Sequence, residues 1–467
     1  MSFPVAPYLG LALLGIVGLV GCSDDPHISA PGPVPAEPQR SGDPTRGYHA
    51  LVNAPYVTCG VPREAFDRAT AQATYSHGDT LPGRTGPNAD LPYHATTHTT
   101  SAGVELVVSN CLGCHAGRFN GELVLGLGDE TRDWTEDAAL AAEALGRYVR
   151  TPEAEAEWRR WADRMAAMAP YTTTDTVGVN PANTLTVALM AHRDPETLAW
   201  FDTPLLEPPP PGPLPVSVPP LWHMAKKNAL YYSTEGRGDH ARHLILATLF
   251  CSDSVADVEA IDAYAPDILA YLKTLEAPDY PFAIDHGLAT RGETVFEAHC
   301  SDCHGRYGAE ESYPNVVVTL EKIGTDPLLA QKAVEAKRFA DWHAQSYFGE
   351  VSRAAPAPGY IAPPLDGVWA TAPFLHNGSV PTLEALLDSS QRPRYWTWSF
   401  DSRDFDQQAL GWRFTALDQG KAAARSFAEA KVIYDTTLQG YSNRGHTYGD
   451  ELTAAERRAL LEYLKTL

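Results

Sequence analysis

The chain has 467 residues, of which 44% are hydrophobic and 10% aromatic, enough for about two to three globular domains with substantial cores. This composition excludes an intrinsically disordered protein. The formal net charge of −22 at pH 7 argues against nucleic-acid binding, which needs basic patches.

The first residues predict an export signal. An apolar core runs from Leu11 to Val20, and Gly21-Cys22 follows it, as in a bacterial lipobox whose cysteine is lipidated. Lys and Arg are absent before the core, unlike in the usual signal, and the alternatives are an ordinary signal peptide or a short anchor. We expect a signal peptide over residues 1–22 and lipidation at Cys22.

By resemblance to sorted lipoproteins, Ser23 after the lipidated cysteine indicates the outer membrane. We therefore expect a lipid-anchored protein in the cell envelope of a Gram-negative-type bacterium, with its folded part in the periplasm or at the cell surface. Residues 23–46 are rich in Pro, Gly, Ser and charge, which predicts a flexible tether.

Two segments of one kind, Cys111–His115 and Cys300–His304, have the pattern C-x-x-C-H. This spacing lets two thiols form thioethers with one haem while the histidine binds the iron. A zinc half-site or a pair of disulfides is the alternative, but two matches in an exported chain favour two covalently bound haem c groups. The predicted haem-binding residues are Cys111, Cys114, His115, Cys300, Cys303 and His304.

Two further cysteines, Cys59 and Cys251, have no role in these motifs. Leftover cysteines in an oxidising compartment often pair, so we expect a disulfide between them. The alternative is two unrelated buried thiols.

An internal repeat divides the chain. The pentapeptide Tyr-Leu-Lys-Thr-Leu occupies residues 271–275 and again residues 463–467, each time at a similar distance after a C-x-x-C-H motif. This regularity indicates two copies of one architecture. We therefore predict a mainly α fold of two cytochrome c-like domains in tandem, over residues 47–278 and 287–467.

Other segments complete the predicted fold. Residues 137–169 have the composition and period of an amphipathic helix. The proline-rich residues 204–220 are expected to form an extended loop. Thr453 and Glu456 form a capping box that starts a C-terminal helix.

Residues 369–383, from Trp369 to Leu383, resemble a signature of the bacterial di-haem cytochrome c peroxidase superfamily. Lys-Lys-Asn at 226–228, Gly-Arg-Gly-Asp at 236–239 and Asn-Arg-Gly-His at 443–446 make the chain most similar to the rubber oxygenase branch. Calcium between the domains is common in the peroxidase branch, but no acidic cluster in this sequence supports it.

The resemblance implies that the two haems differ. His115 would be the proximal ligand of an N-terminal haem that reacts with oxidant, with a role for the nearby Trp222. His304 and His446 would be the axial ligands of a C-terminal haem that passes electrons. From the residues alone, His446 lies in a glycine-flanked loop that can approach a haem face, and the alternative is a surface histidine. Arg237 is a candidate donor to a bound oxygen species or to a propionate.

We therefore expect an oxidoreductase, a haem-dependent oxygenase or peroxidase, that acts with O₂ or H₂O₂ on an unknown organic substrate or redox protein. The amount of protein per haem exceeds what a carrier needs, which favours an enzyme. The alternatives are a non-catalytic periplasmic electron-transfer cytochrome c and a redox or gas sensor.

Overall fold

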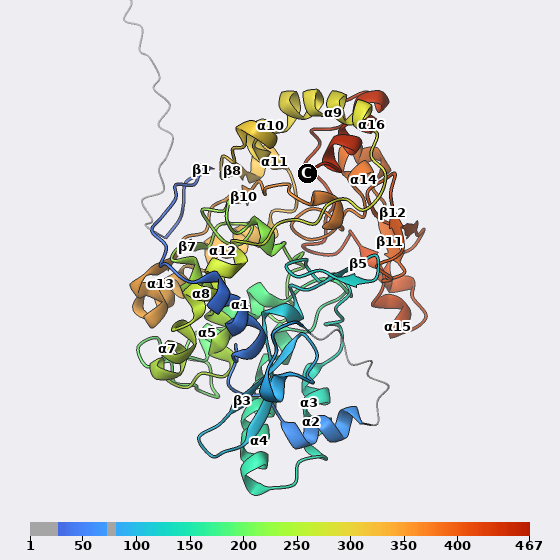
Figure 1. The fold of residues 1–467 in the computed structure, drawn as a ribbon. Helices are drawn as coiled ribbons and strands as arrows, with labels where there is room; N and C mark the ends of the chain where they lie inside the picture. The colour runs from blue at the N-terminus through green and yellow to red at the C-terminus, as the bar shows by residue number, and fades with distance from the viewer. Residues whose placement is uncertain (1–26, 72–80) are drawn as a thin grey trace, which may run out of the picture.

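The computed structural model describes residues 27–71 and 81–467, and within them the fold is mixed (Figure 1). It is 39% helical and 12% strand, with several small sheets. The prediction of a mainly α fold made of two cytochrome c-like domains in tandem is therefore wrong. The strands are two to five residues long, too short for the alternation of apolar and polar residues by which a sequence reveals a strand.

The elements of the first half surround the first C-x-x-C-H motif. Its helices are α1 (Pro44–Asn53), α2 (Arg63–Thr70), α3 (Ala138–Gly146), α4 (Pro152–Met168), α5 (Ala182–Ala191), α6 (His240–Leu244), α7 (Val255–Asp262) and α8 (Ala265–Leu272). Its strands are β1 (Gly32–Pro33), β2 (Val61–Pro62), β3 (Ala95–Thr99), β4 (Glu105–Ser109), β5 (Arg118–Phe119), β6 (Glu122–Leu123) and β7 (Gly236–Gly238).

The elements of the second half begin directly before the second motif. Its helices are α9 (His286–His299), α10 (Ser301–His304), α11 (Leu320–Ile323), α12 (Leu328–Glu335), α13 (Lys337–Gln345), α14 (Leu383–Leu387), α15 (Phe427–Ala430) and α16 (Ala454–Leu464). Its strands are β8 (Val316–Thr319), β9 (Ser352–Ala354), β10 (Gly359–Ile361), β11 (Tyr395–Trp398), β12 (Phe405–Asp406), β13 (Gly411–Trp412), β14 (Phe414–Ala416) and β15 (Tyr434–Asp435).

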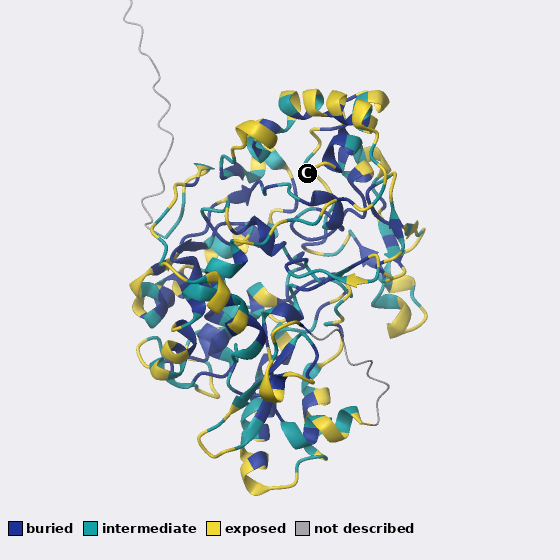
Figure 2. Ribbon diagram, viewed as in Figure 1, coloured by how far each residue is buried: buried dark blue, intermediate teal, exposed yellow. Residues whose placement is uncertain are grey.

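The repeated pentapeptide corresponds to two similar helix pairs, α1 with α8 and α9 with α16. Each pair crosses at a glycine. A Cβ atom at Gly47 would lie 1.9 Å from the carbonyl oxygen of Asp267, and one at Gly292 would lie 2.0 Å from that of Ala459. Only glycine permits such a close approach of two backbones. In Figure 2 the outer helix α9 is largely exposed, whereas its Phe296 is fully buried.

The two halves are interlocked rather than arranged in tandem. Strand β7 of the first half pairs with β9 of the second. Phe339 and Trp342 of α13 pack in the core of the first half, and the Trp342 indole donates to the Arg193 carbonyl over 2.7 Å. Conversely, Phe119 of the first half packs against Trp369 with ring centroids 5.0 Å apart. Each core therefore contains residues from both halves.

Part of the predicted tether packs on this body. Strand β1 pairs with β8. Arg40 donates hydrogen bonds to the carboxylates of Asp262, over 2.6 Å, and Asp239, over 2.9 Å. The predicted signal peptide, residues 1–22, and Cys22 itself lie outside the described residues. The predicted domain boundaries stay predictions.

The helix predicted over residues 137–169 is divided into α3 and α4. The break lies where Thr151 caps α4 through a hydrogen bond from the Ala154 amide and Pro152 begins the helix, a proline position that ends any preceding helix. The capping box predicted at Thr453 and Glu456 is confirmed.

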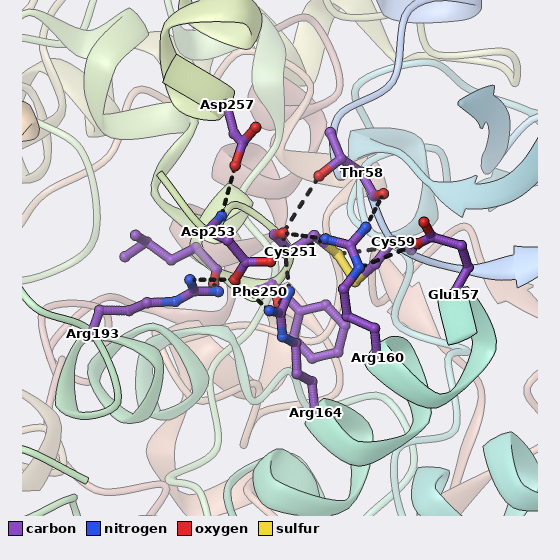
Figure 3. Close-up of a disulfide and its surroundings, with 11 residues drawn as sticks. Thr58, Cys59, Glu157, Arg160, Arg164, Arg193, Phe250, Cys251, Asp253 and Asp257 are labelled. Carbon is purple, nitrogen blue, oxygen red and sulfur yellow. Dashed lines mark hydrogen bonds and ion pairs between the residues drawn. A yellow bond between two sulfur atoms is a disulfide. The ribbon is translucent and has the colours of Figure 1, made fainter. Parts of the chain in front are cut away.

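Cys59 and Cys251 form a disulfide (Figure 3). Three guanidinium groups beside it, those of Arg160, Arg164 and Arg193, all contact the carboxylate of Asp253. The disulfide fastens the segment before β2 to the segment after α6. The ion cluster fastens α4, through Arg160 and Arg164, to the same segment. Within residues 27–71 and 81–467, no helix has both the length and the apolar composition needed to cross a membrane.

Candidate haem site

A cavity of about 240 Å³ lies between the second motif and the first half of the chain. Most of its lining is apolar, and its polar groups are histidines, tyrosines, a lysine, two threonines, a serine and the two cysteines of the motif. From the second half the lining includes Phe296, Cys300, Cys303, His304, Pro363, Leu383, Leu386, His376 and His446, and from the first half Pro219, Pro220, His223, Lys227, Tyr231 and Tyr232.

The second motif begins where α9 ends. Cys300 caps α9, and the chain continues into the short helix α10, which ends at His304. The His304 ring places Nδ1 2.8 Å from the carbonyl oxygen of Pro363. A metal-binding histidine commonly donates its other ring N–H to a carbonyl in this way. Nε2 of His304 is thereby left available as a ligand.

His446 faces His304 in the cavity. The two ring centroids are 6.1 Å apart, with an angle of 57° between the ring planes. Metal–nitrogen bonds to imidazole are about 2 Å long, so two imidazoles on opposite sides of one metal ion have centroids roughly 6 Å apart. Nδ1 of His446 is buried without a hydrogen-bond partner among the described residues. The pair would suit the binding of one haem iron.

Both imidazoles are held in the form that binds metal. Burial lowers the pKa of His446 to about 4, and the nearby His304 lowers it further. Burial also lowers the pKa of His304, with the Pro363 carbonyl acting in the opposite direction. Both rings are therefore neutral at neutral pH, and neutral imidazole is the ligand form.

The loop that carries His446 is fixed by Arg392. Its guanidinium makes five hydrogen bonds to backbone carbonyl oxygens at 2.7–3.1 Å. The acceptors are Ala385 and Leu386 of α14, and Asn443, Gly445 and His446 in the loop. Leu386 lines the cavity. His446 itself has a left-handed backbone with φ 46°, which a non-glycine residue adopts only when its surroundings enforce it.

The first motif follows strand β4 in a tight turn, Cys111–Gly113, capped by Asn110 through the Leu112 amide over 3.0 Å. Burial lowers the pKa of His115 to about 4, with a further decrease from Lys227 and a small opposing effect from the Pro219 carbonyl. Nδ1 of His115 is also buried without a hydrogen-bond partner in the described part of the chain.

The histidines of the two motifs differ in whether a second histidine ring packs against them. In the described residues no other histidine ring packs against His115 as His446 packs against His304. His192 is stacked on Trp200 at 4.7 Å. His243 places Nε2 2.9 Å from the Arg353 carbonyl. The rings of His192 and His243 therefore contact other parts of the fold.

Trp222 lies between the two motifs. Its indole N–H donates to the Asp366 carbonyl over 2.8 Å, and His223 Nε2 lies 2.9 Å from the same oxygen. On the other side, the Leu221 amide donates to Gly126, whose own amide donates to the His115 carbonyl over 2.9 Å. Two backbone hydrogen bonds and the indole N–H of Trp222 thus connect His115 to the segment that holds His304.

The structure places Arg237 elsewhere. Its guanidinium forms an ion pair with Glu37 and lies 3.3 Å from the Pro35 carbonyl. It is not among the residues that line the cavity. The guanidinium is therefore already occupied in holding the N-terminal segment on the body.

A short repeat was not predicted from the sequence. Pro-Pro-Leu occurs at Pro219–Leu221 and again at Pro363–Leu365. In each copy the carbonyl of the first proline lies beside the histidine of a C-x-x-C-H motif. Comparison of the two halves around these prolines would have revealed it.

The cysteines of both motifs are unpaired. Burial raises the pKa of Cys111 and of Cys300 to about 12, with their partner cysteines contributing further. In the described residues, no group of three or more His, Cys, Asp or Glu side chains is arranged to hold a metal ion, so the structure adds no support for calcium.

Comparison with known proteins identifies the segment that forms much of this cavity. Residues 359–397 match a family described as RoxA-like, cytochrome c-like. The chain is similar to the RoxA-like cytochromes c. Such a domain binds haem c, in agreement with the C-x-x-C-H motifs. The wider resemblance to di-haem peroxidases stays a prediction.

Two relatives come from Sinorhizobium fredii. The uncharacterized protein y4iJ is 32% identical over 248 residues, covering 40% of this chain and 39% of that protein. The uncharacterized protein y4iM is 30% identical over 252 residues, covering 45% of this chain and 56% of that protein. The chain thus matches about two fifths to just over half of each relative's length.

Proposed function

We propose that the protein is a haem c oxidoreductase whose two motifs have different tasks. The first serves the reaction with O₂ or peroxide, and the second passes electrons. The observation that carries this proposal is the contrast between His304, which faces His446 at 6.1 Å, and His115, which has no such neighbour in the described residues.

The residues that would hold two haems are Cys111, Cys114 and His115 at the first motif, and Cys300, Cys303, His304 and His446 at the second. The apolar cavity supports this fit at the second motif. At each motif a buried histidine Nδ1, of His115 and of His446, has no hydrogen-bond partner among the described residues. Haem c supplies one-electron chemistry, and at an open axial position it also accepts a small oxidant.

The chain's own residues hold and separate the two centres. Pro363 orients His304, and Arg392 fixes the loop that presents His446. Trp222 is anchored at the Asp366 carbonyl, and the preceding Leu221 is linked through Gly126 to His115. Burial excludes water from all three histidine rings and keeps them neutral.

The organic substrate or redox partner is proposed only as a class. The likeness to RoxA-like cytochromes supports an organic substrate oxidised with O₂. Export and lipidation at Cys22 are likewise proposals, supported by the apolar core before that cysteine and by the disulfide, which suits an oxidising compartment. They place the protein in the periplasm or at the surface of the outer membrane.

The test is spectroscopic. Pyridine haemochrome analysis of the purified protein gives the haem count, for which we expect two. We expect EPR to give one low-spin signal from the His304–His446 centre, and CO to bind about half of the haem after reduction. If both haems are low-spin and neither binds CO or reacts with peroxide, the protein is an electron carrier.

A further inference from the structure

Two adjacent lysines, Lys226 and Lys227, have opposite surroundings. The Lys226 ammonium lies 2.6 Å from Asp366 Oδ1 and also pairs with Glu311. Lys227 lines the cavity, and among the described residues its side chain has neither a hydrogen bond nor an ion pair. The charge of Lys226 is therefore paired with acidic side chains, whereas the charge of Lys227 has no partner among the described residues.

An unpaired ammonium in a largely apolar cavity is unfavourable, because buried charges require a partner. Burial alone lowers the pKa of Lys227 to about 8, so most of it remains charged at neutral pH. Its charge acts on the histidine of the first motif and on a cavity histidine, since it lowers the pKa values of His115 and of His223. Burial keeps His115 and His223 neutral, and among the described residues no anion compensates the charge of Lys227.

We propose that Lys227 binds a carboxylate that enters this cavity. This carboxylate belongs either to the haem, as a propionate, or to an organic substrate that carries a carboxyl group. In the first case the inference rests on the proposed function. Tyr231, which lines the same cavity and is 44% exposed, adds a phenolic hydroxyl to the site.

The position of Lys227 suits this task. It follows Trp222 and His223 in the chain, which are anchored at Asp366. Pro219 and Pro220, on the same cavity wall, adjoin the first motif, and Pro363 adjoins the second. A carboxylate at Lys227 would lie between the two centres, where its charge affects the reduction potential of both.

The experiment compares Lys227→Met with Lys226→Met in the full-length haem protein. If the carboxylate is a propionate, removing the ammonium leaves its negative charge uncompensated and stabilises the ferric form. We expect Lys227→Met to raise the ferric-to-ferrous ratio of at least one haem at fixed potential by roughly tenfold, a shift of about 59 mV for a one-electron couple. Lys226→Met should shift it much less.

A second measurement identifies the source. Hexanoate, as a simple carboxylate probe, is titrated into both variants and the unchanged protein by calorimetry. Binding to the unchanged protein that Lys227→Met abolishes and Lys226→Met retains, with unaltered potentials, indicates a substrate carboxylate. A shifted potential without hexanoate binding indicates the propionate.

The inference is overturned if Lys227→Met changes neither the potentials nor hexanoate binding, or if both variants behave alike. Failure of the proposed function looks different. A protein purified without haem refutes the two-haem proposal. Carboxylate binding by Lys227 is then tested by hexanoate titration alone.

Discussion

Arg392 donates a hydrogen bond of 3.0 Å to the backbone carbonyl of His446, so the side chain that fixes the cavity wall also fixes the second histidine. The same guanidinium bonds the carbonyls of Asn443 and Gly445 at 2.7 Å each. Five donors in one plane can be supplied only by arginine.

Arg392→Lys is therefore expected to loosen the loop while keeping the charge. A lysine replaces at most three of the five bonds, and each buried carbonyl left unpaired costs about 1–3 kcal/mol. We expect a lower free energy of unfolding and a partial high-spin signal in the EPR spectrum. Arg394→Lys, at an exposed neighbouring position, is the control, and equal spectra for the two variants would argue against the positioning role.

His446→Ala should convert the second centre from low-spin to high-spin without changing the first. The reason is the loss of the ring that faces His304. Absorption and EPR spectra measure this, with His299→Ala, which alters another cavity histidine, as the control. An unchanged low-spin signal in His446→Ala would show that another residue is the ligand.

Gly292→Ala is expected to destabilise the α9–α16 pair, because the added methyl would overlap the Ala459 carbonyl oxygen at 2.0 Å. Overpacking of this kind costs roughly 1–3 kcal/mol or more. Gly287→Ala lies in the same helix, with its nearest contact at 3.3 Å, and should change stability by no more than about 1 kcal/mol. Denaturant unfolding compares the two, and equal stabilities would contradict the close crossing.

Loss of the disulfide should destabilise the first half. The bond joins residues 192 positions apart, and removal of such a crosslink costs about 2–5 kcal/mol. We expect Cys59→Ser and Cys251→Ser to lower the unfolding midpoint equally, and reductant to have the same effect on the unchanged protein. A midpoint insensitive to both treatments would mean that the two cysteines are not bonded in solution.

Glu130 predicts a specific pH dependence. Burial raises its pKa to about 8, against opposing hydrogen bonds from the Val218 amide and the Ser217 hydroxyl. The folded protein therefore keeps a proton that the unfolded chain releases above its ordinary pKa of 4.5. The stability that this proton contributes is present below pH 4.5 and is lost as the pH rises through about 8.

Glu130→Gln removes this titration while keeping an acceptor for both donors. Its stability relative to the unchanged protein should increase by up to about 1.4 kcal/mol per pH unit between those pH values and then level off. Chemical unfolding at a series of pH values measures it. A difference that does not vary with pH would show that Glu130 is ionised in the folded protein.

The sequence was sufficient to predict the local features whose chemistry has a fixed spacing. The motif at Cys300–His304, the capping box at Thr453 and the loop candidate His446 needed only neighbouring residues for their prediction. The structure places His446 opposite His304. The role of either as an iron ligand stays a prediction for spectroscopy.

Long-range relationships were beyond the sequence. Strand β7 has three residues and finds its partner β9 more than a hundred residues later, so no local period revealed the sheet. Arg237 illustrates the same limit, because its partner Glu37 lies in the predicted tether. Arg392 gave no signal either, since its partners are backbone carbonyls, which every residue carries.

The interlocked halves also set an order of assembly. A chain exported from its N-terminus delivers both disulfide cysteines and the first motif before α13 and β9 arrive. The core around the first motif cannot close until these later residues insert. Pairings of such long sequence separation fold slowly. If haem is attached at Cys111 and Cys114 as proposed, both cysteines would be accessible for that reaction before the core closes. A chain truncated after residue 278 lacks Phe339 and Trp342 and therefore exposes apolar surface of the core around the first motif.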